Sequence, residues 1–169
     1  MSTRPSSRAR RLPAPTAART PAEDLGILLT SALGAFKDRL HAHLAAAGYT
    51  DLGPSFGFVF RSLADEPMSL AQLASRLGIT SQGTLKIVDE MERRGYVQRK
   101  EDEADQRVRR VALTGRGRSA LREARRFHAE VERELTKSLG PRRVADARAV
   151  LEVLSGDEAG TRRWLRPVW

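Results

Sequence analysis

The feature that most constrains this sequence is residues 69–113, where four short elements follow one another closely. Apolar residues recur at helical spacing over Leu70–Leu77 and predict a short amphipathic helix. Ser69 followed by Gln72 is typical of a capping box, and Gly78 can adopt the left-handed backbone that ends a helix. Both ends of this first helix are therefore encoded locally.

A second helix is predicted over residues 81–94, with Thr80 as its N-terminal cap and Gly95 at its end. Its two faces differ in chemistry. The face expected to pack inward carries Thr84, Ile87, Val88 and Met91. The opposite face, expected to be exposed, carries Ser81, Gln82, Leu85, Lys86 and Asp89. Two helices in this order are typical of a helix-turn-helix.

Two strands are predicted after the second helix, over residues 96–100 and 109–113. The loop between them is too long for a tight hairpin and is rich in charged residues, so it should project into solvent. A hairpin in this place is a wing. The predicted fold class is mainly α with a small β-wing.

Further helices are predicted on both sides of this stretch. A helix capped by Thr20 should run to about residue 47, and Gly53-Pro54 should open the next one. After the wing, we expect a long helix capped by Thr114 and a last helix over residues 142–154. One stripe of the long helix predicts packing along another helix. Its members are Leu121, Ala124, His128, Val131 and Leu135.

The charge balance favours a polyanionic partner. The net charge is +9 and the pI is about 11.0, so nucleic acid is the first candidate and an anionic membrane surface the second. Residues 1–21 hold five arginines and no acidic residue, and they include Pro5, Pro13 and Pro15. This composition predicts a disordered basic arm that either touches DNA phosphates or has no role.

Several other classes of protein are disfavoured. The chain has no cysteine, which excludes disulfides, thiolate nucleophiles and cysteine-ligated zinc and fits a cytoplasmic protein. No apolar run approaches the roughly 20 residues that span a bilayer. The sequence lacks a nucleotide-binding glycine loop, a nucleophile elbow and a paired-carboxylate motif. We therefore expect no enzymatic activity, cofactor, metal or membrane partner.

The exposed face of the second helix suits a DNA major groove, which is about 12 Å wide and admits one helix. Ser81 can bond a base or a phosphate, and Gln82 can pair with adenine. Leu85 can contact a thymine methyl group, and Lys86 suits a phosphate or a guanine edge. This face is the predicted DNA-reading surface.

The predicted wing adds Arg107 and Arg109, since an arginine at a wing tip can enter a minor groove. Asp105 can orient Arg107 through a charge-assisted hydrogen bond. The helix caps Ser69 and Thr80 complete the set of residues expected at DNA. The alternative is a winged helix that only docks another protein.

With these residues in place, the chain resembles the MarR (multiple antibiotic resistance regulator) family of winged-helix transcription factors. The match lies in Leu-Ala-Gln-Leu-Ala at residues 70–74, Ile-Thr-Ser at 79–81 and Arg-Gly-Tyr-Val at 94–97. Its most specific part is the wing, Asp-Glu-Ala-Asp-Gln-Arg at 102–107, followed by Leu-Thr-Gly at 113–115.

The resemblance implies a homodimer that binds a pseudo-palindromic operator. In chain order, the first, fifth and sixth of the six predicted helices and the C-terminal tail would form most of its interface. It implies a repressor that a small aromatic or anionic ligand releases from double-stranded DNA. By position, Asp105 would stabilise the wing and Arg107 would enter the minor groove. A low-specificity, nucleoid-type DNA binder remains an alternative that the basic arm supports.

The same resemblance predicts the organisation of the chain. Residues 1–21 would be the arm and residues 22–155 a MarR-type domain. Within it, the winged helix-turn-helix would span about 52–114, between dimerisation helices at about 22–48 and 116–155. Residues 156–169 would join the dimer interface.

A ligand site would be lined by side chains from the two helices that precede residue 69. Core packing explains these side chains equally well. They are Phe36, Leu40, His43, Phe56 and Phe60. His41 and His43 point in different directions on one helix, so a zinc site would need ligands from other elements.

Overall fold

The computed structural model describes residues 24–101 and 109–155. Helices predominate and a small sheet joins them, which confirms the predicted fold class. In chain order the elements are α1 (Leu25–Ala46), α2 (Phe56–Ser62), β1 (Met68–Ser69), α3 (Leu70–Leu77), α4 (Ser81–Arg93), β2 (Val97–Glu101), β3 (Arg109–Leu113), α5 (Gly115–Leu139) and α6 (Pro141–Ser155).

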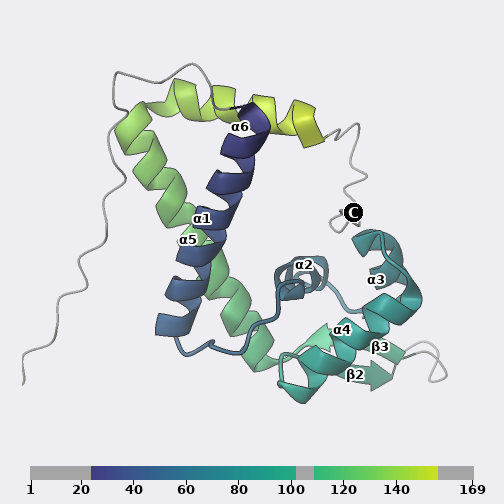
Figure 1. The fold of residues 1–169 in the computed structure, drawn as a ribbon. Coiled ribbons are helices and arrows are strands. Elements are labelled where there is room, and N and C mark those ends of the chain that lie inside the picture. Colours follow the sequence, from purple (N-terminus) through teal and green to yellow (C-terminus); the bar gives the residue numbers. More distant parts are fainter. Residues whose placement is uncertain (1–23, 102–108, 156–169) are drawn as a thin grey trace, which may run out of the picture.

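These elements form two parts (Figure 1). The winged lobe consists of α2, α3, α4 and the sheet. The long-helix part consists of α1 and α5, which cross each other, and α6, which lies at their end remote from the winged lobe. α5 joins the two parts, because it contacts α2 and β3 as well as α1 and α6.

The sheet has three antiparallel strands in the order β1-β3-β2. β2 and β3 form the predicted hairpin, with Glu101 opposite Arg109 at the base of the wing loop. The loop itself, residues 102–108, lies outside the described residues. β1 was not predicted. It has only two residues, and Met68 lies opposite Val111, so the partner strand rather than an alternating pattern defines it.

The predicted ends of the helix-turn-helix are confirmed. The Ser69 hydroxyl accepts a hydrogen bond from the backbone N–H of Gln72 at 3.2 Å, and the Gln72 side chain accepts one from the Ser69 N–H at 2.9 Å. Gly78 ends α3 with a φ of 72°. The Thr80 hydroxyl accepts from the N–H of Gly83 at 3.1 Å and caps α4. These bonds satisfy backbone donors that a bare helix end leaves free.

Two predicted helix starts were wrong. α1 begins at Leu25 because the Asp24 carboxylate accepts from the N–H of Gly26 at 2.9 Å, while Asp24 itself has a non-helical backbone. The predicted cap, Thr20, lies outside the described residues. α2 begins at Phe56 rather than at Gly53-Pro54, because residues 53–55 form a turn in which the Phe56 N–H donates to the Gly53 carbonyl at 3.1 Å.

The winged lobe holds the main hydrophobic core. α3 packs on α4, and Leu73, Leu77 and Val88 of these two helices are fully buried in one core. Burial of this kind contributes roughly 1.5–3 kcal/mol for each large aliphatic side chain. The two helices are thus held firmly enough for one to support the other.

The long-helix part packs through a narrower stripe. Leu121 and Val131 of α5 are buried as predicted, and His128 is half-buried. Phe127 was missed by the predicted stripe, yet it is buried with its ring centroid 5.3 Å from that of Phe36 on α1. No residue of α6 is buried. Within the described residues, no helix combines the length and the apolarity needed to cross a membrane.

Candidate nucleic-acid interface

The two faces of α4 are separated as the sequence predicted. Thr84, Val88 and Met91 are completely buried, and Ile87 packs against the same core. The opposite face is open to solvent and carries Ser81, Gln82, Leu85, Lys86 and Asp89. Leu85 is 39% exposed and is the one large apolar side chain on this face. This surface is called the α4 outer face.

The burial of Thr84 has a simple polar explanation. Its hydroxyl donates to the Thr80 carbonyl at 3.0 Å, so the only polar side-chain group on the inner face of α4 is hydrogen-bonded. Thr80 therefore serves the helix start twice, through its side chain and through its carbonyl. Thr80 is itself exposed, and with its neighbours Ser81 and Gln82 it forms the exposed N-terminal end of α4.

The other predicted contact residues have different settings. Ser69 is half-buried at the start of α3, with its hydroxyl engaged in the capping box. Arg109 is exposed at the base of the wing, where β3 begins. Arg107 and Asp105 lie outside the described residues. The described part of the predicted set therefore lies in three places: along the α4 outer face with its cap Thr80, at the start of α3, and at the start of β3.

A charged cluster that the sequence did not indicate ties α4 to the wing. Arg99 of β2 donates through its guanidinium to the carboxylates of Asp89 and Glu92 on α4. The Arg99 backbone N–H also donates to Glu92 Oε1 at 3.0 Å. The hydrogen bond to Asp89 is the main cause that raises the pKa of Arg99 above its usual value. The partners lie seven and ten residues before Arg99 and on a different element, so no helix or strand periodicity pairs them.

A second cluster lies where the winged lobe meets α5. The buried Tyr96 hydroxyl donates to Asp51, and Arg116 of α5 donates to Asp51 Oδ1 at 2.9 Å. The hydrogen bond from Tyr96 lowers the pKa of Asp51, and Arg116 lowers it further, although burial opposes both. Gly117 packs against the Tyr96 carbonyl so closely that a Cβ atom there would lie 2.1 Å from the oxygen. This junction fixes the start of α5 to the lobe.

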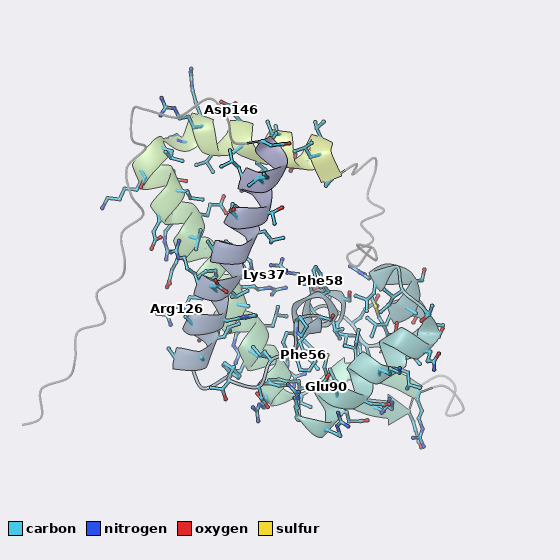
Figure 2. All side chains as sticks on the ribbon, viewed as in Figure 1. Lys37, Phe56, Phe58, Glu90, Arg126 and Asp146 are labelled. Carbon is cyan, nitrogen blue, oxygen red and sulfur yellow. The ribbon has the colours of Figure 1, made fainter. Side chains whose placement is uncertain are left out.

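A cavity of about 230 Å³ lies between α1, α2 and α5. Phe36, Leu40, Phe56 and Phe60, four of the five predicted ligand-pocket residues, line it. Cationic side chains line it too, namely Lys37, Arg61 and Arg125. Lys37 extends from α1 toward α2 (Figure 2). An apolar cavity with convergent cations is suited to a small anion with a hydrophobic body.

The histidines do not follow the predicted arrangement. His41, not His43, lines the cavity. His43 instead lies against the Phe127 ring, with Nε2 3.5 Å from a Glu123 carboxylate oxygen. His41 and His43 are two positions apart on α1, so their side chains point in different directions and, of the two, only His41 lines the cavity. Among residues 24–101 and 109–155, no group of three or more potential metal ligands comes together.

His128 connects the two parts of the molecule. Its Nε2 lies 2.9 Å from a guanidinium nitrogen of Arg61, which belongs to α2. Since arginine can only donate, the imidazole is the acceptor and is neutral on that nitrogen. Burial lowers the pKa of His128 below 6.5, and the Arg61 charge lowers it further. The predicted packing role of His128 thus includes a polar contact.

A family model matches part of the winged lobe. A model described as "MarR family" matches residues 58–108, which run from α2 into the wing. No curated protein matches the sequence. The family model covers the α3–α4 pair and β2, the elements that hold and orient the α4 outer face.

Solved structures extend the likeness to the long helices. FabT of Streptococcus pneumoniae in complex with DNA has a TM-score of 0.64 and 21% identity, covering 78% of this chain and 94% of that chain. The transcriptional repressor CouR, bound to a 23-mer DNA duplex, has a TM-score of 0.60 and 27% identity, covering 79% and 91%. Apo MarR from E. coli has a TM-score of 0.57 and 21% identity, covering 79% and 98%.

The buried α3–α4 pair and the hairpin beside it define a winged helix-turn-helix protein. The family match and the structural neighbours confirm the predicted resemblance: the chain has the fold of the MarR-family DNA-binding transcriptional regulators.

Proposed function

We propose that this protein is a transcriptional regulator that binds double-stranded DNA by placing α4 in a major groove. The observation that carries the proposal is the division of α4 into an inner face packed in the core and an exposed outer face with short polar side chains near its N-terminus. The DNA-bound state of the FabT and CouR structures supports it. Base edges are read from this end of a recognition helix.

The proposed contacts follow from side-chain chemistry. Gln82 is suited to adenine and Lys86 to a phosphate or guanine, while Leu85 offers an apolar surface to a thymine methyl. Ser81 and the caps Ser69 and Thr80 are suited to phosphates at helix N-termini. At the wing, Arg109 would contact the backbone and Arg107 the minor groove, with Asp105 orienting Arg107.

We further propose that the protein acts as a homodimer through the long-helix part. Exposed apolar side chains gather on the two helices that have the fewest buried residues. On α1 they are Leu25, Ile27 and Leu33, and on α6 they are Val150, Leu151, Val153 and Leu154. Val153 is 81% exposed, so water covers surface that a second copy would remove from water. Residues 156–169 would extend this interface, and a two-fold dimer matches a pseudo-palindromic operator.

A ligand-controlled repressor is the mode of action that the cavity supports. The cavity lies between α2 of the winged lobe and both long helices, so its occupant would touch both parts of the molecule. Ligand pockets typically measure about 300–1,000 Å³, so this one suits a small ligand. A small aromatic or anionic compound that binds there would shift the lobe relative to α5 and release the DNA.

The rival function is low-specificity DNA packaging, which the net charge of +9 favours. A protein-docking winged helix is the second rival. A salt series of binding to the duplex upstream of the protein's own gene, with a scrambled duplex of equal composition as control, separates all three. A regulator binds the upstream duplex more tightly at every salt concentration, and both affinities fall as salt rises. Equal affinity for the two duplexes would support packaging, and no binding would support docking.

A further inference from the structure

Asp89 presents an electrostatic problem for the proposed DNA-binding surface. It lies on the α4 outer face three residues after Lys86 and seven after Gln82, so the three side chains share one side of the helix. Its side chain is 49% exposed. A free carboxylate in this position would repel the phosphates that flank a major groove.

Arg99 provides the compensating charge from another element. Its guanidinium reaches from β2 to Asp89 and to Glu92, one turn further along α4. With 23% of its side chain exposed, Arg99 is the most buried member of the trio, since Glu92 is 36% exposed. Arg99 bridges two carboxylates and is mostly buried. Solvent screening and side-chain entropy therefore weaken its ion pairs less than they weaken a pair on the open surface.

The same contacts set the geometry of the surface. The Arg99 N–H donates to Glu92 Oε1 at 3.0 Å, so both backbone and side chain of this residue are attached to α4. β2 pairs along its length with β3, which places Arg99 opposite Val111 and the exposed Arg109 two residues further along the hairpin. Arg99 therefore adds a polar attachment between the wing strands and α4 to the apolar packing of Met91 against the core that Val97 and Val111 share.

We propose that Arg99 is a positioning residue for DNA binding, which neutralises Asp89 on the α4 outer face and fixes the wing strand to that helix. The inference rests on the proposed function. This role differs from a direct contact with DNA, because the Arg99 guanidinium donates to carboxylates of its own chain. It also differs from a purely structural role, because its effect on DNA should depend on the charge of Asp89.

The test is a double-mutant cycle on the full-length protein, read by fluorescence anisotropy with a short labelled duplex from upstream of the gene. Arg99→Gln exposes two unpaired carboxylates and should weaken binding about tenfold. Asp89→Asn alone removes a carboxylate from this surface and leaves Arg99 paired with Glu92, so it should raise affinity, by less than Arg99→Gln lowers it. The double variant should recover most of the loss, because the carboxylate that repelled the phosphates is gone. Arg122→Gln, which removes an equal charge from the exposed side of α5, is the control and should change affinity less than about twofold.

Each result decides something. Failure of Asp89→Asn to restore binding in the double variant would show that Arg99 contacts DNA or only maintains the fold, and would overturn the inference. An Arg99→Gln protein that binds like the wild type would overturn it as well, while leaving the proposed function intact. Absence of binding by the wild-type protein would overturn both. Thermal denaturation of the four proteins separates loss of fold from loss of charge compensation, because only charge compensation is restored by removing Asp89.

Discussion

The winged lobe and the long-helix part of this molecule use the same apolar residue types in opposite ways. In the lobe, Leu77 and Val88 are completely buried between two short helices. On α6, Leu151 and Leu154 are more than half exposed although they recur at the same helical spacing. The lobe closes its core within one chain, whereas the long helices present apolar surface outward. Apolar residues on a helix therefore do not by themselves indicate whether that helix is buried within its own chain.

A pair of matched substitutions should separate the two parts most strongly. Leu77→Ala removes a side chain from the closed core and should lower the free energy of unfolding by about 2–5 kcal/mol. Leu154→Ala removes the same atoms from an exposed position and should change the unfolding of a single chain little. Chemical denaturation of both variants measures the difference.

Protein concentration sharpens this comparison. If α6 belongs to a dimer interface, the melting temperature of the wild type should rise with concentration, and Leu154→Ala should lower it only at concentrations where the wild type is dimeric, because the second copy stabilises the fold by mass action. The effect of Leu77→Ala should be similar at all concentrations. Equal losses for the two variants at high dilution would contradict the division into a closed and an open part.

The junction between the parts should be the next most sensitive point. In Gly117→Ala the new Cβ would lie 2.1 Å from the Tyr96 carbonyl oxygen, so the start of α5 must move away from the lobe. We expect a loss of roughly 1–3 kcal/mol in the free energy of unfolding. Gly115→Ala is the control, because its Cβ would meet no atom within 4 Å. A Gly117→Ala protein as stable as Gly115→Ala would mean that the junction is not rigid.

A smaller effect is expected at the start of α4. Thr80→Ala removes the hydroxyl that caps the helix and should lower the free energy of unfolding by about 1 kcal/mol. Thr80→Ser keeps the oxygen and should retain most of the stability. Urea denaturation distinguishes the two. A loss shared equally by both variants would assign the effect to the methyl group instead of the cap.

The smallest predicted effect is a pH dependence at the contact between Arg61 and His128. The pKa of His128 is lowered below 6.5 in the folded protein, so the unfolded chain binds the proton more readily. Stability should therefore be full above pH 6.5 and fall as the pH drops below that value. His128→Gln keeps a hydrogen-bond acceptor but cannot titrate, and should flatten this part of the melting-temperature profile. An unchanged profile would assign the acid sensitivity to other groups.

The fold was largely predictable because its signals are local. Ser69 with Gln72, Thr80 with Gly83 and the left-handed Gly78 lie within a few residues of the helix ends that they define. β1 was missed because two residues are too few for any pattern, and α1 was started too early because Asp24, not Thr20, provides the cap.

The candidate site was predictable only in part. The α4 outer face follows from helical spacing, and Gln82 and Lys86 are exposed on it as predicted, while their contact with DNA stays a prediction. Arg99 was missed because its partners on α4 are brought to it by the turn at Gly95 and the course of β2, which no spacing rule encodes. The exchange of His43 for His41 at the cavity has a similar origin: a few tens of degrees of helix rotation decide which histidine faces inward.

The most direct test of the account is a hydroxyl-radical footprint of the full-length protein on the duplex upstream of its gene. Two α4 helices of a homodimer, each in a major groove on the same side of the duplex, should protect two segments whose centres are about 10 base pairs, or a multiple of that, apart. The Gln82→Ala protein should weaken both protections together. Unphased protection along the whole duplex, or a single protected segment, would contradict the proposal that this chain reads DNA as a two-fold dimer through α4.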